Sequence, residues 1–149
     1  ADLTPADTSS YITPALAAAL RRYHPAVEEF RIPLDPPAGA VADLRARLAA
    51  FDLVVIGTIN ATAHAGQAAL VNALLADGTP TVAVALRLPY DLQAYPAAPT
   101  YLCTYSLLES SMTALAAALW GRQPCSGRLP VAIPDLYPLG HGLALLEGS

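Results

Sequence analysis

The sequence predicts an α/β fold: a three-layer sandwich in which a mostly parallel sheet is flanked by helices. Three apolar runs rich in β-branched residues predict the strands, at 52–58, 81–86 and 100–105. These runs are continuously apolar rather than alternating, so we expect both faces of each strand to be covered, as in a parallel sheet. Helical patterns fall between the runs, an alternation that is typical of βαβ crossovers.

The expected helices show apolar residues at helical spacing. They lie at residues 14–23, 41–51, 67–76 and 111–120. Gly78 and Gly121 follow two of these patterns and are predicted to end them, because glycine readily adopts the left-handed conformation that closes a helix. A fourth, weaker strand is expected at Val27 to Ile32, whose polar positions favour a place near a sheet edge.

The closing segment from Arg122 to Gly142 is rich in proline and glycine but still contains apolar residues, notably Leu129, Val131 and Ile133. We therefore expect an ordered tail laid over the domain.

Length and composition indicate one globular domain over residues 1–149, large enough to bury a core. With 54% hydrophobic and 13% charged residues, the composition excludes a disordered chain. The longest apolar stretch, near Met112 to Trp120, falls short of the roughly 20 residues that a membrane span needs. The net charge is −4 and the basic residues are scattered arginines, which argues against nucleic acid as a partner.

The chain begins at Ala1 without an initiator methionine, and its first predicted helix has no strand ahead of it. Parallel α/β domains ordinarily begin with a strand, so we expect a fragment of a larger protein with a strand just before Ala1. Whether that protein is secreted or cytoplasmic stays open.

No cofactor or metal is expected. The sequence has neither a G-x-G-x-x-G nor a G-x-x-x-x-G-K-[ST] pattern for nucleotides. Cys103 and Cys125 match neither a disulfide framework nor a zinc site, and the three histidines lie far apart in the sequence.

Ligands of open parallel sheets bind at the carboxyl ends of the strands, which are here followed by loops at 58–66, 88–95 and 106–110. The first loop carries Asn60 and His64, and His64 is either a ligand-facing residue or a polar residue that starts a helix. Arg87 precedes the second loop.

Two carboxylates lie in these loops, and both sit where a structural role is favoured. Asp91 lies in a turn, where aspartate usually bonds its own backbone, and Glu109 lies at a helix start, where a carboxylate meets free amides. His141, between two glycines, either orients the tail or reaches a neighbouring domain.

The tail resembles the closing signature of family 3 glycoside hydrolases. The run from Gly127 to Val131 reads Gly-Arg-Leu-Pro-Val, and Gly140 to Leu143 reads Gly-His-Gly-Leu. Upstream, Ala85 to Asp91 reads Ala-Leu-Arg-Leu-Pro-Tyr-Asp, which is similar to a motif of bacterial two-domain β-N-acetylhexosaminidases. Leu88 departs from that motif, because related sequences often carry Asn there. The likeness covers about residues 50 to 143.

The resemblance implies a catalytic barrel ahead of this α/β domain in the same polypeptide, with the nucleophilic aspartate on the barrel. In the β-glucosidase branch of the family, the acid/base glutamate lies on a loop that corresponds to residues 58–65 here. That loop has no carboxylate, which fits the hexosaminidase branch, where a histidine and an aspartate on a barrel loop act as acid/base. The chain is thus expected to be a C-terminal accessory domain, without catalytic residues and inactive alone, of an enzyme of cell-wall aminosugar metabolism that cleaves β-linked N-acetylglucosamine-type glycosides.

The residues expected nearest the sugar cleft or the barrel interface are Asn60, His64, Arg87, Asp91 and His141. An isolated fragment would expose the apolar surface that faced its barrel, so a fragment dimer is one possible assembly. Two alternatives stay open at this point: a stand-alone flavodoxin-like domain that binds a small molecule or regulates, and a complete small hydrolase that uses Ser106 or Cys125.

Overall fold

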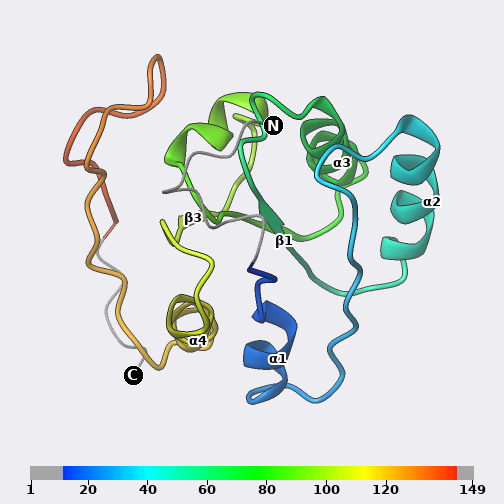
Figure 1. Ribbon diagram of the computed structural model, residues 1–149, viewed down its shortest axis with the longest axis horizontal. Helices are drawn as coiled ribbons and strands as arrows, with labels where there is room; N and C mark the ends of the chain where they lie inside the picture. The colour runs from blue at the N-terminus through cyan, green and yellow to red at the C-terminus, as the bar shows by residue number, and fades with distance from the viewer. Residues whose placement is uncertain (1–11, 144–149) are drawn as a thin grey trace. The chain divides into compact units, whose positions relative to one another are not determined.

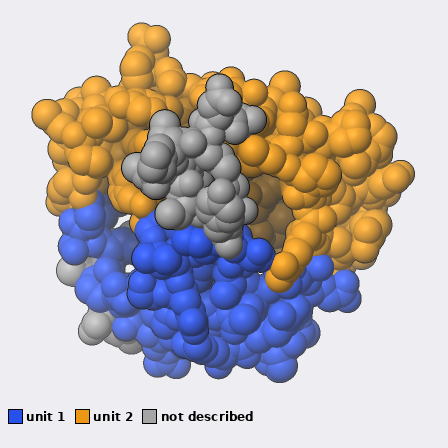
Figure 2. Space-filling model, in the orientation of Figure 1, with its two compact units in different colours: residues 1–29, 106–127, 143–149 blue, residues 30–105, 128–142 orange. Residues whose placement is uncertain are grey.

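The computed structural model describes residues 12–143, which form two compact units, coloured separately in Figure 2. Unit 1 contains residues 12–29, 106–127 and 143, and unit 2 contains residues 30–105 and 128–142. The expectation of a single domain over residues 1–149 stays a prediction.

Unit 2 is built on a parallel sheet of three strands, in the order β1-β2-β3 (Figure 1). The strands are β1 (Val54–Thr58), β2 (Thr81–Ala85) and β3 (Tyr101–Cys103). Val54 pairs with Thr81, and Ala83 pairs in turn with Tyr101. The predicted α/β class and the parallel sheet flanked by helices are confirmed, and all three strong strand predictions are confirmed with shorter ends.

Helices α2 (Ala38–Leu48) and α3 (Ala65–Ala76) pack together beside the sheet (Figure 1). Their apolar faces and one face of the sheet form the core. Its buried members include Val41, Leu44, Leu48, Val54, Ile56, Leu70, Val71, Leu74 and Ala83. Each large aliphatic side chain buried in this way stabilises the fold by about 1.5–3 kcal/mol relative to exposure.

Alternate residues of β2 point to the opposite face of the sheet, because side chains alternate along a strand. Val82, Val84 and Leu86 lie on that face and are 8%, 0% and 4% exposed. The whole of β2 is therefore buried, as the continuous apolar run predicted. Gly57 lies on the same face, where a Cβ atom would stand 2.7 Å from Leu86 Cδ1.

The prediction of a fourth strand at Val27 to Ile32 is wrong. Residues 27–32 form no helix or strand and do not extend the sheet, which has three strands in the described residues. Two side chains of the segment, Phe30 and Ile32, still pack on the core of unit 2. These apolar residues indicate packing rather than strand pairing, and Arg31 between them is charged and exposed.

The segment after β2 also differs from the expected loop. Residues Pro89–Ala94 form a short 3-10 helix, η1, which begins at a proline. Proline suits the first turn of a helix, because its fixed φ is already helical and its missing N–H would have no partner there. η1 is what brings Asp91 against the end of β1.

The expected ordered tail is confirmed within unit 2. Ile133 is 2% exposed and joins the core, with Leu129 packed beside it. The tail folds back on itself: the Leu129 amide donates to the His141 carbonyl (2.8 Å), and the Gly140 amide donates to the Leu129 carbonyl (2.9 Å).

Unit 1 consists of helices α1 (Leu16–Arg21) and α4 (Glu109–Leu119), which pack against each other. The buried faces carry small and flexible residues, namely Ala17, Ala19, Leu20, Met112, Leu115 and Ala116. Tyr23 stacks on Trp120 beyond the helix ends, with ring centroids 5.5 Å apart. Gly121 ends α4 with a left-handed φ of 64°, as predicted.

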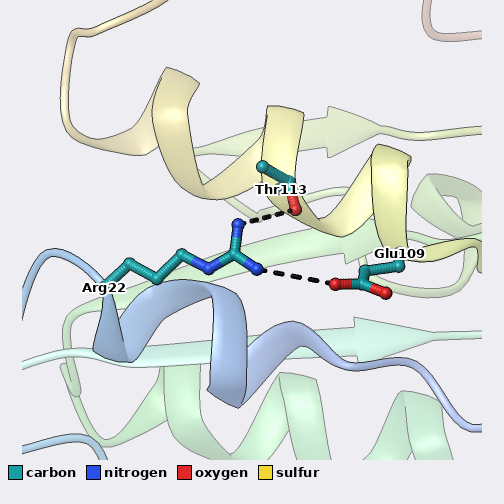
Figure 3. Close-up of polar contacts among 3 residues, drawn as sticks. All are labelled: Arg22, Glu109 and Thr113. Atoms are coloured by element: carbon teal, nitrogen blue, oxygen red, sulfur yellow. Dashed lines mark hydrogen bonds and ion pairs between the residues drawn. The ribbon is translucent and has the colours of Figure 1, made fainter.

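An exposed polar cluster also joins the two helices (Figure 3). Arg22 donates to the Thr113 hydroxyl at 3.4 Å and to the Glu109 carboxylate at 3.5 Å. Both charged side chains are more than half exposed, so this ion pair contributes little to stability. None of the helices between residues 12 and 143 has both the length and the apolar character that crossing a membrane requires.

Because α3 packs closely against residues 34–36, one methyl group added at Gly66 is expected to lower the stability of the fold strongly. A Cβ atom at Gly66 would stand 2.1 Å from the Pro36 carbonyl oxygen, which is backbone and cannot rotate away. We expect Gly66→Ala to lower the free energy of unfolding by about 2 kcal/mol or more. Urea denaturation measures this change.

Gly39 is the matched control, because it lies in α2 with open space around its Cα. Gly39→Ala should leave stability unchanged or raise it by up to about 1 kcal/mol through better helix propensity. Equal stability of the two variants would contradict the described packing of α3.

Candidate functional site

The parallel strands end at one edge of the sheet, where Thr58, Ala85 and Cys103 are their last residues. The turn at residues 59–64 leaves β1 at this edge, and η1 follows β2. Four of the five predicted site residues follow β1 or β2 at this edge: Asn60 and His64 lie in the turn, Arg87 lies just after β2, and Asp91 lies in η1. The predicted third loop, residues 106–110, belongs to unit 1.

A buried hydrogen-bond network holds this edge together. The Thr58 hydroxyl lies 2.7 Å from Asp91 Oδ2 and 2.7 Å from the Tyr95 hydroxyl. A hydroxyl has one proton. Since an ionised carboxylate only accepts, Thr58 donates to Asp91 and Tyr95 donates to Thr58. The three side chains are 0–1% exposed.

The second oxygen of the same carboxylate reaches the turn. The Ala61 amide donates to Asp91 Oδ1 at 2.9 Å. Asp91, which lies in η1, thus joins the end of β1 to the turn that follows β1. The expectation that this aspartate bonds its own local backbone is not met, because the amide that it accepts from belongs to Ala61 in the turn after β1.

Burial raises the pKa of Asp91 above its ordinary value, because the ionised form loses hydration. The Thr58 hydroxyl, the Ala61 amide and the nearby His64 act in the opposite direction and oppose part of this rise. Burial also raises the pKa of Tyr95, so this phenol keeps its proton and remains a donor.

Gln67 ties the other end of the turn. Its amide group accepts from the Ile59 amide (2.8 Å) and donates to the Ile59 carbonyl (2.9 Å) and the Leu34 carbonyl (2.7 Å). Nearby, the Gly66 amide donates to Asp35 Oδ1 at 2.7 Å. The turn is therefore fixed at Ile59 by Gln67 and at Ala61 by Asp91.

Asn60 lies between these two ties in a conformation that costs free energy. Its φ is 54°, a left-handed value that asparagine tolerates better than most residues. Its side-chain Oδ1 is buried without a hydrogen-bond partner in the part of the chain that the structure describes. An unsatisfied buried acceptor costs about 1–3 kcal/mol, so the ties must hold the turn against this preference.

His64 begins α3 as its N-cap residue, and its side chain makes no capping hydrogen bond. His64 is thus a polar residue that starts a helix, as one of the two expectations for it had it. The ring is half-buried and near enough to Asp91 to influence the pKa of that carboxyl. Arg87 follows β2 and is also half-buried.

The end of β3 carries a second left-handed residue, Tyr105, with φ 56°. Burial raises the pKa of Tyr105 to about 12 and raises the pKa of the Cys103 thiol. Cys103 therefore favours its neutral thiol form, which is a poor nucleophile. The Tyr101 hydroxyl donates to the Pro89 carbonyl at 2.9 Å and so links β3 to η1.

His141 lies in the tail rather than at a strand end. Its ring stacks on Tyr137 with centroids 4.2 Å apart, and its backbone carbonyl accepts from Leu129. These contacts give His141 a place in the tail's own structure. Its predicted contact with a neighbouring domain stays a prediction.

Ser106, one of the two residues of the alternative small hydrolase, has a structural partner. Ser106 Oγ accepts from the Leu108 amide at 3.1 Å, and Glu109 pairs with Arg22. No group of three metal-ligating side chains occurs among residues 12–143. The carboxylates of Asp35 and Asp91 each accept a hydrogen bond from a backbone amide.

Sequence reasoning placed Thr58 and Tyr95 at the limits of two predicted loops, 58–66 and 88–95, but did not single them out as site residues. Both look like ordinary core residues in the sequence, and the network becomes evident only when η1 is folded. η1 is a 3-10 helix, in which residues three apart align, and Tyr95 follows it as the C-cap residue, so no helical spacing in the sequence marks Asp91 and Tyr95 as a pair.

Comparison with solved structures identifies the class of protein that has this fold. A family 3 β-N-acetylglucosaminidase from Paenibacillus sp. str. FPU-7 matches with a TM-score of 0.68 and 30% identity, over 72% of this chain and 20% of that enzyme. A fungal multi-domain family 3 β-N-acetylglucosaminidase, described as having a GCN5-related glucosamine N-acetyltransferase region, matches with a TM-score of 0.75 and 26% identity. That match covers 86% of this chain and 15% of that one. No family model and no curated protein sequence matches the chain.

These matches confirm the resemblance to family 3 glycoside hydrolases of the β-N-acetylglucosaminidase type. The chain spans about a fifth or less of the solved enzymes that it matches. The chain is therefore similar to a segment of these multi-domain enzymes, and that segment is an α/β sandwich.

The network around Thr58 predicts a large loss of stability from one isosteric change. Thr58→Val leaves the Tyr95 hydroxyl and one oxygen of Asp91 without partners, and we expect it to lower the free energy of unfolding by about 2–4 kcal/mol. Thr81→Val is the control, since the Thr81 hydroxyl makes one bond, to the Thr79 carbonyl at 2.8 Å. Its expected loss is about 1 kcal/mol. Equal losses in the two variants would argue against the network.

The raised pKa of Asp91 predicts a pH dependence of stability. The folded state binds the Asp91 proton more tightly than the unfolded state, whose aspartates titrate near about 3.9. This contribution to stability is fully present below that value and is lost as pH rises through the higher folded-state pKa. Urea denaturation across pH should show that wild-type stability falls relative to Asp91→Asn over this interval. Parallel pH curves for the two proteins would contradict the direction of the shift.

Proposed function

We propose that this chain is the accessory α/β domain of a family 3 glycoside hydrolase of the β-N-acetylhexosaminidase type. The observation that carries the proposal is the 30% identity over 72% of the chain, joined to a TM-score of 0.68, with such an enzyme. The matched segment is 20% of that enzyme, which leaves room for a separate catalytic part. In this proposal the chain packs on the catalytic barrel of its own polypeptide and walls one side of the sugar cleft.

The proposed substrates are β-linked N-acetylglucosamine-type glycosides, in bacterial cell-wall aminosugar metabolism. The turn at residues 59–64 supports the hexosaminidase branch, because it contains no carboxylate that could replace the acid/base glutamate of β-glucosidases. The nucleophile and the acid/base then both belong to the barrel, and the isolated chain hydrolyses nothing.

The carboxyl edge of the sheet is the surface proposed to face the barrel. Asn60, His64 and Arg87 are partly exposed there and are the proposed contacts. Asp91 is buried beneath this edge and holds the turn through the Ala61 amide. His141 is proposed to reach the barrel from the tail. The fold alone would equally suit a stand-alone small-molecule binding domain, and the similarity to glycosidases is what favours the proposal.

An activity assay tests the proposal. The gene product that contains this chain should release 4-nitrophenol from 4-nitrophenyl N-acetyl-β-glucosaminide, whereas the 149-residue chain alone should release none above background. In the whole gene product, Asn60→Ala and His64→Ala should each lower kcat/KM by about tenfold, the equivalent of one lost hydrogen bond.

Asp43→Ala is the control for these variants, since Asp43 is exposed on α2 away from the strand ends. It should leave kcat/KM unchanged. Hydrolysis by the isolated chain, or a whole gene product without activity on this glycoside, would refute the proposal.

A further inference from the structure

We propose that Asp91 is a positioning residue that fixes the turn at residues 59–64 and thereby sets how Asn60 and His64 are presented at the carboxyl edge. What the turn faces rests on the proposed function, whereas the positioning itself rests on the geometry alone. Asp91 is 1% exposed, so it acts on anything beyond the edge through the residues it holds.

The carboxylate of Asp91 is itself oriented before it meets the turn. Tyr95 donates to Thr58, which directs the Thr58 proton to Asp91 Oδ2. With that oxygen engaged, Oδ1 is left to accept from the Ala61 amide. The position of the turn is thus fixed relative to the end of β1 by the side chains of Tyr95, Thr58 and Asp91, none of which lies in the turn.

The turn needs such a tie because its own preferences oppose its conformation. Asn60 is left-handed and its Oδ1 has no partner among the described residues. Gln67 fixes Ile59, the residue before Asn60, and Asp91 fixes Ala61, the residue after it. Release of either neighbour frees Asn60 to rotate toward a relaxed conformation and to turn its amide toward solvent.

The hydrogen bond between Asp91 and the Ala61 amide also affects His64, which lies at the end of the turn. It closes the turn at the start of α3, and the Asn60 carbonyl accepts from the Ala63 amide at 2.9 Å just before it. The groups that face the Asp91 carboxylate are Thr58 and Ala61 by hydrogen bonds, and His64, Tyr95, Tyr101 and Cys103 by charge interactions. Among these, His64 carries the only basic side chain.

Amide hydrogen exchange in the 149-residue chain tests the positioning directly. In Asp91→Ala, the Ala61 amide should exchange at least about tenfold faster than in wild type, because it loses its acceptor. The resonances of residues 59–64 should shift, whereas the Ala83 amide, which donates to the Thr100 carbonyl within the sheet, should keep its protection.

Asp91→Asn is the decisive companion, because its amide oxygen still accepts from Ala61. It should restore most of the Ala61 protection. Asp77→Asn is the control, since Asp77 pairs with Arg45 on the exposed side of α3 and should leave the Ala61 amide unchanged. Unchanged Ala61 exchange in Asp91→Ala, or equal loss in Asp91→Ala and Asp91→Asn, would overturn the proposal.

If Asp91→Ala does not fold, Tyr95→Phe supplies the test without removing a charge. It withdraws the donor to Thr58, and the Ala61 amide should then exchange a few-fold faster while Ala83 stays protected. No change at Ala61 in a folded Tyr95→Phe protein would overturn the relay from Tyr95 to the turn.

The functional part is tested in the gene product that contains this chain. Asp91→Ala should raise KM for the 4-nitrophenyl glycoside about tenfold with kcat within about twofold, because it moves a wall of the cleft and not the reacting groups. Asp91→Asn should recover most of KM. An active enzyme whose KM is the same in Asp91→Ala would overturn this part, whereas a gene product with no activity would refute the proposed function and leave the exchange result standing.

Discussion

Burying the carboxylate of Asp91 beside the end of β1 imposes a constraint that the surrounding residues meet together. A buried charge without partners would be strongly destabilising. Thr58 supplies a hydroxyl donor and Ala61 an amide donor, and both reach the carboxylate within 2.9 Å. Tyr95 then satisfies the Thr58 oxygen. One requirement of solvation therefore fixes a strand end, a turn and a 3-10 helix relative to one another.

The rest of the edge is arranged around this network. Gln67 connects the turn to the Leu34 carbonyl, and Gly66 allows residues 34–36 to approach α3 closely. Tyr101 joins β3 to η1 through the Pro89 carbonyl. The segments that a ligand or a neighbouring domain would meet at this edge are thus rigidly supported, and their few unsatisfied features, such as the Asn60 side chain, stand out against that background.

The fold was largely predictable because its signals are local. Continuous apolar runs gave all three strands, and glycines at the helix ends gave two of the stops. The strand expected at 27–32 is absent because a strand also needs a backbone partner, whereas the apolar residues Phe30 and Ile32 need only a core to pack on. The site was predictable in part. Position after a strand identified Asn60, His64, Arg87 and Asp91. Thr58 and Tyr95 were not singled out, because the hydrogen-bonding role of a buried hydroxyl becomes evident only when its partner is placed.

The likeness to family 3 glycosidases was visible in the tail and in the Ala85 to Asp91 run, and the structure explains why these stretches carry it. The tail contributes Ile133 to the core, and the Ala85 to Asp91 run delivers the aspartate that holds the edge. Both sets of residues serve the architecture of the domain.

The most direct test of this account is to read the coding sequence immediately upstream of Ala1. The account predicts a barrel-length segment in the same reading frame, with a His- and Asp-containing catalytic loop of the K-H-[FY]-P-G-H-G-D type, followed by a short apolar strand. A stop codon or an unrelated domain in that place would contradict it, and the chain would then share only the fold and the edge network with these glycosidases.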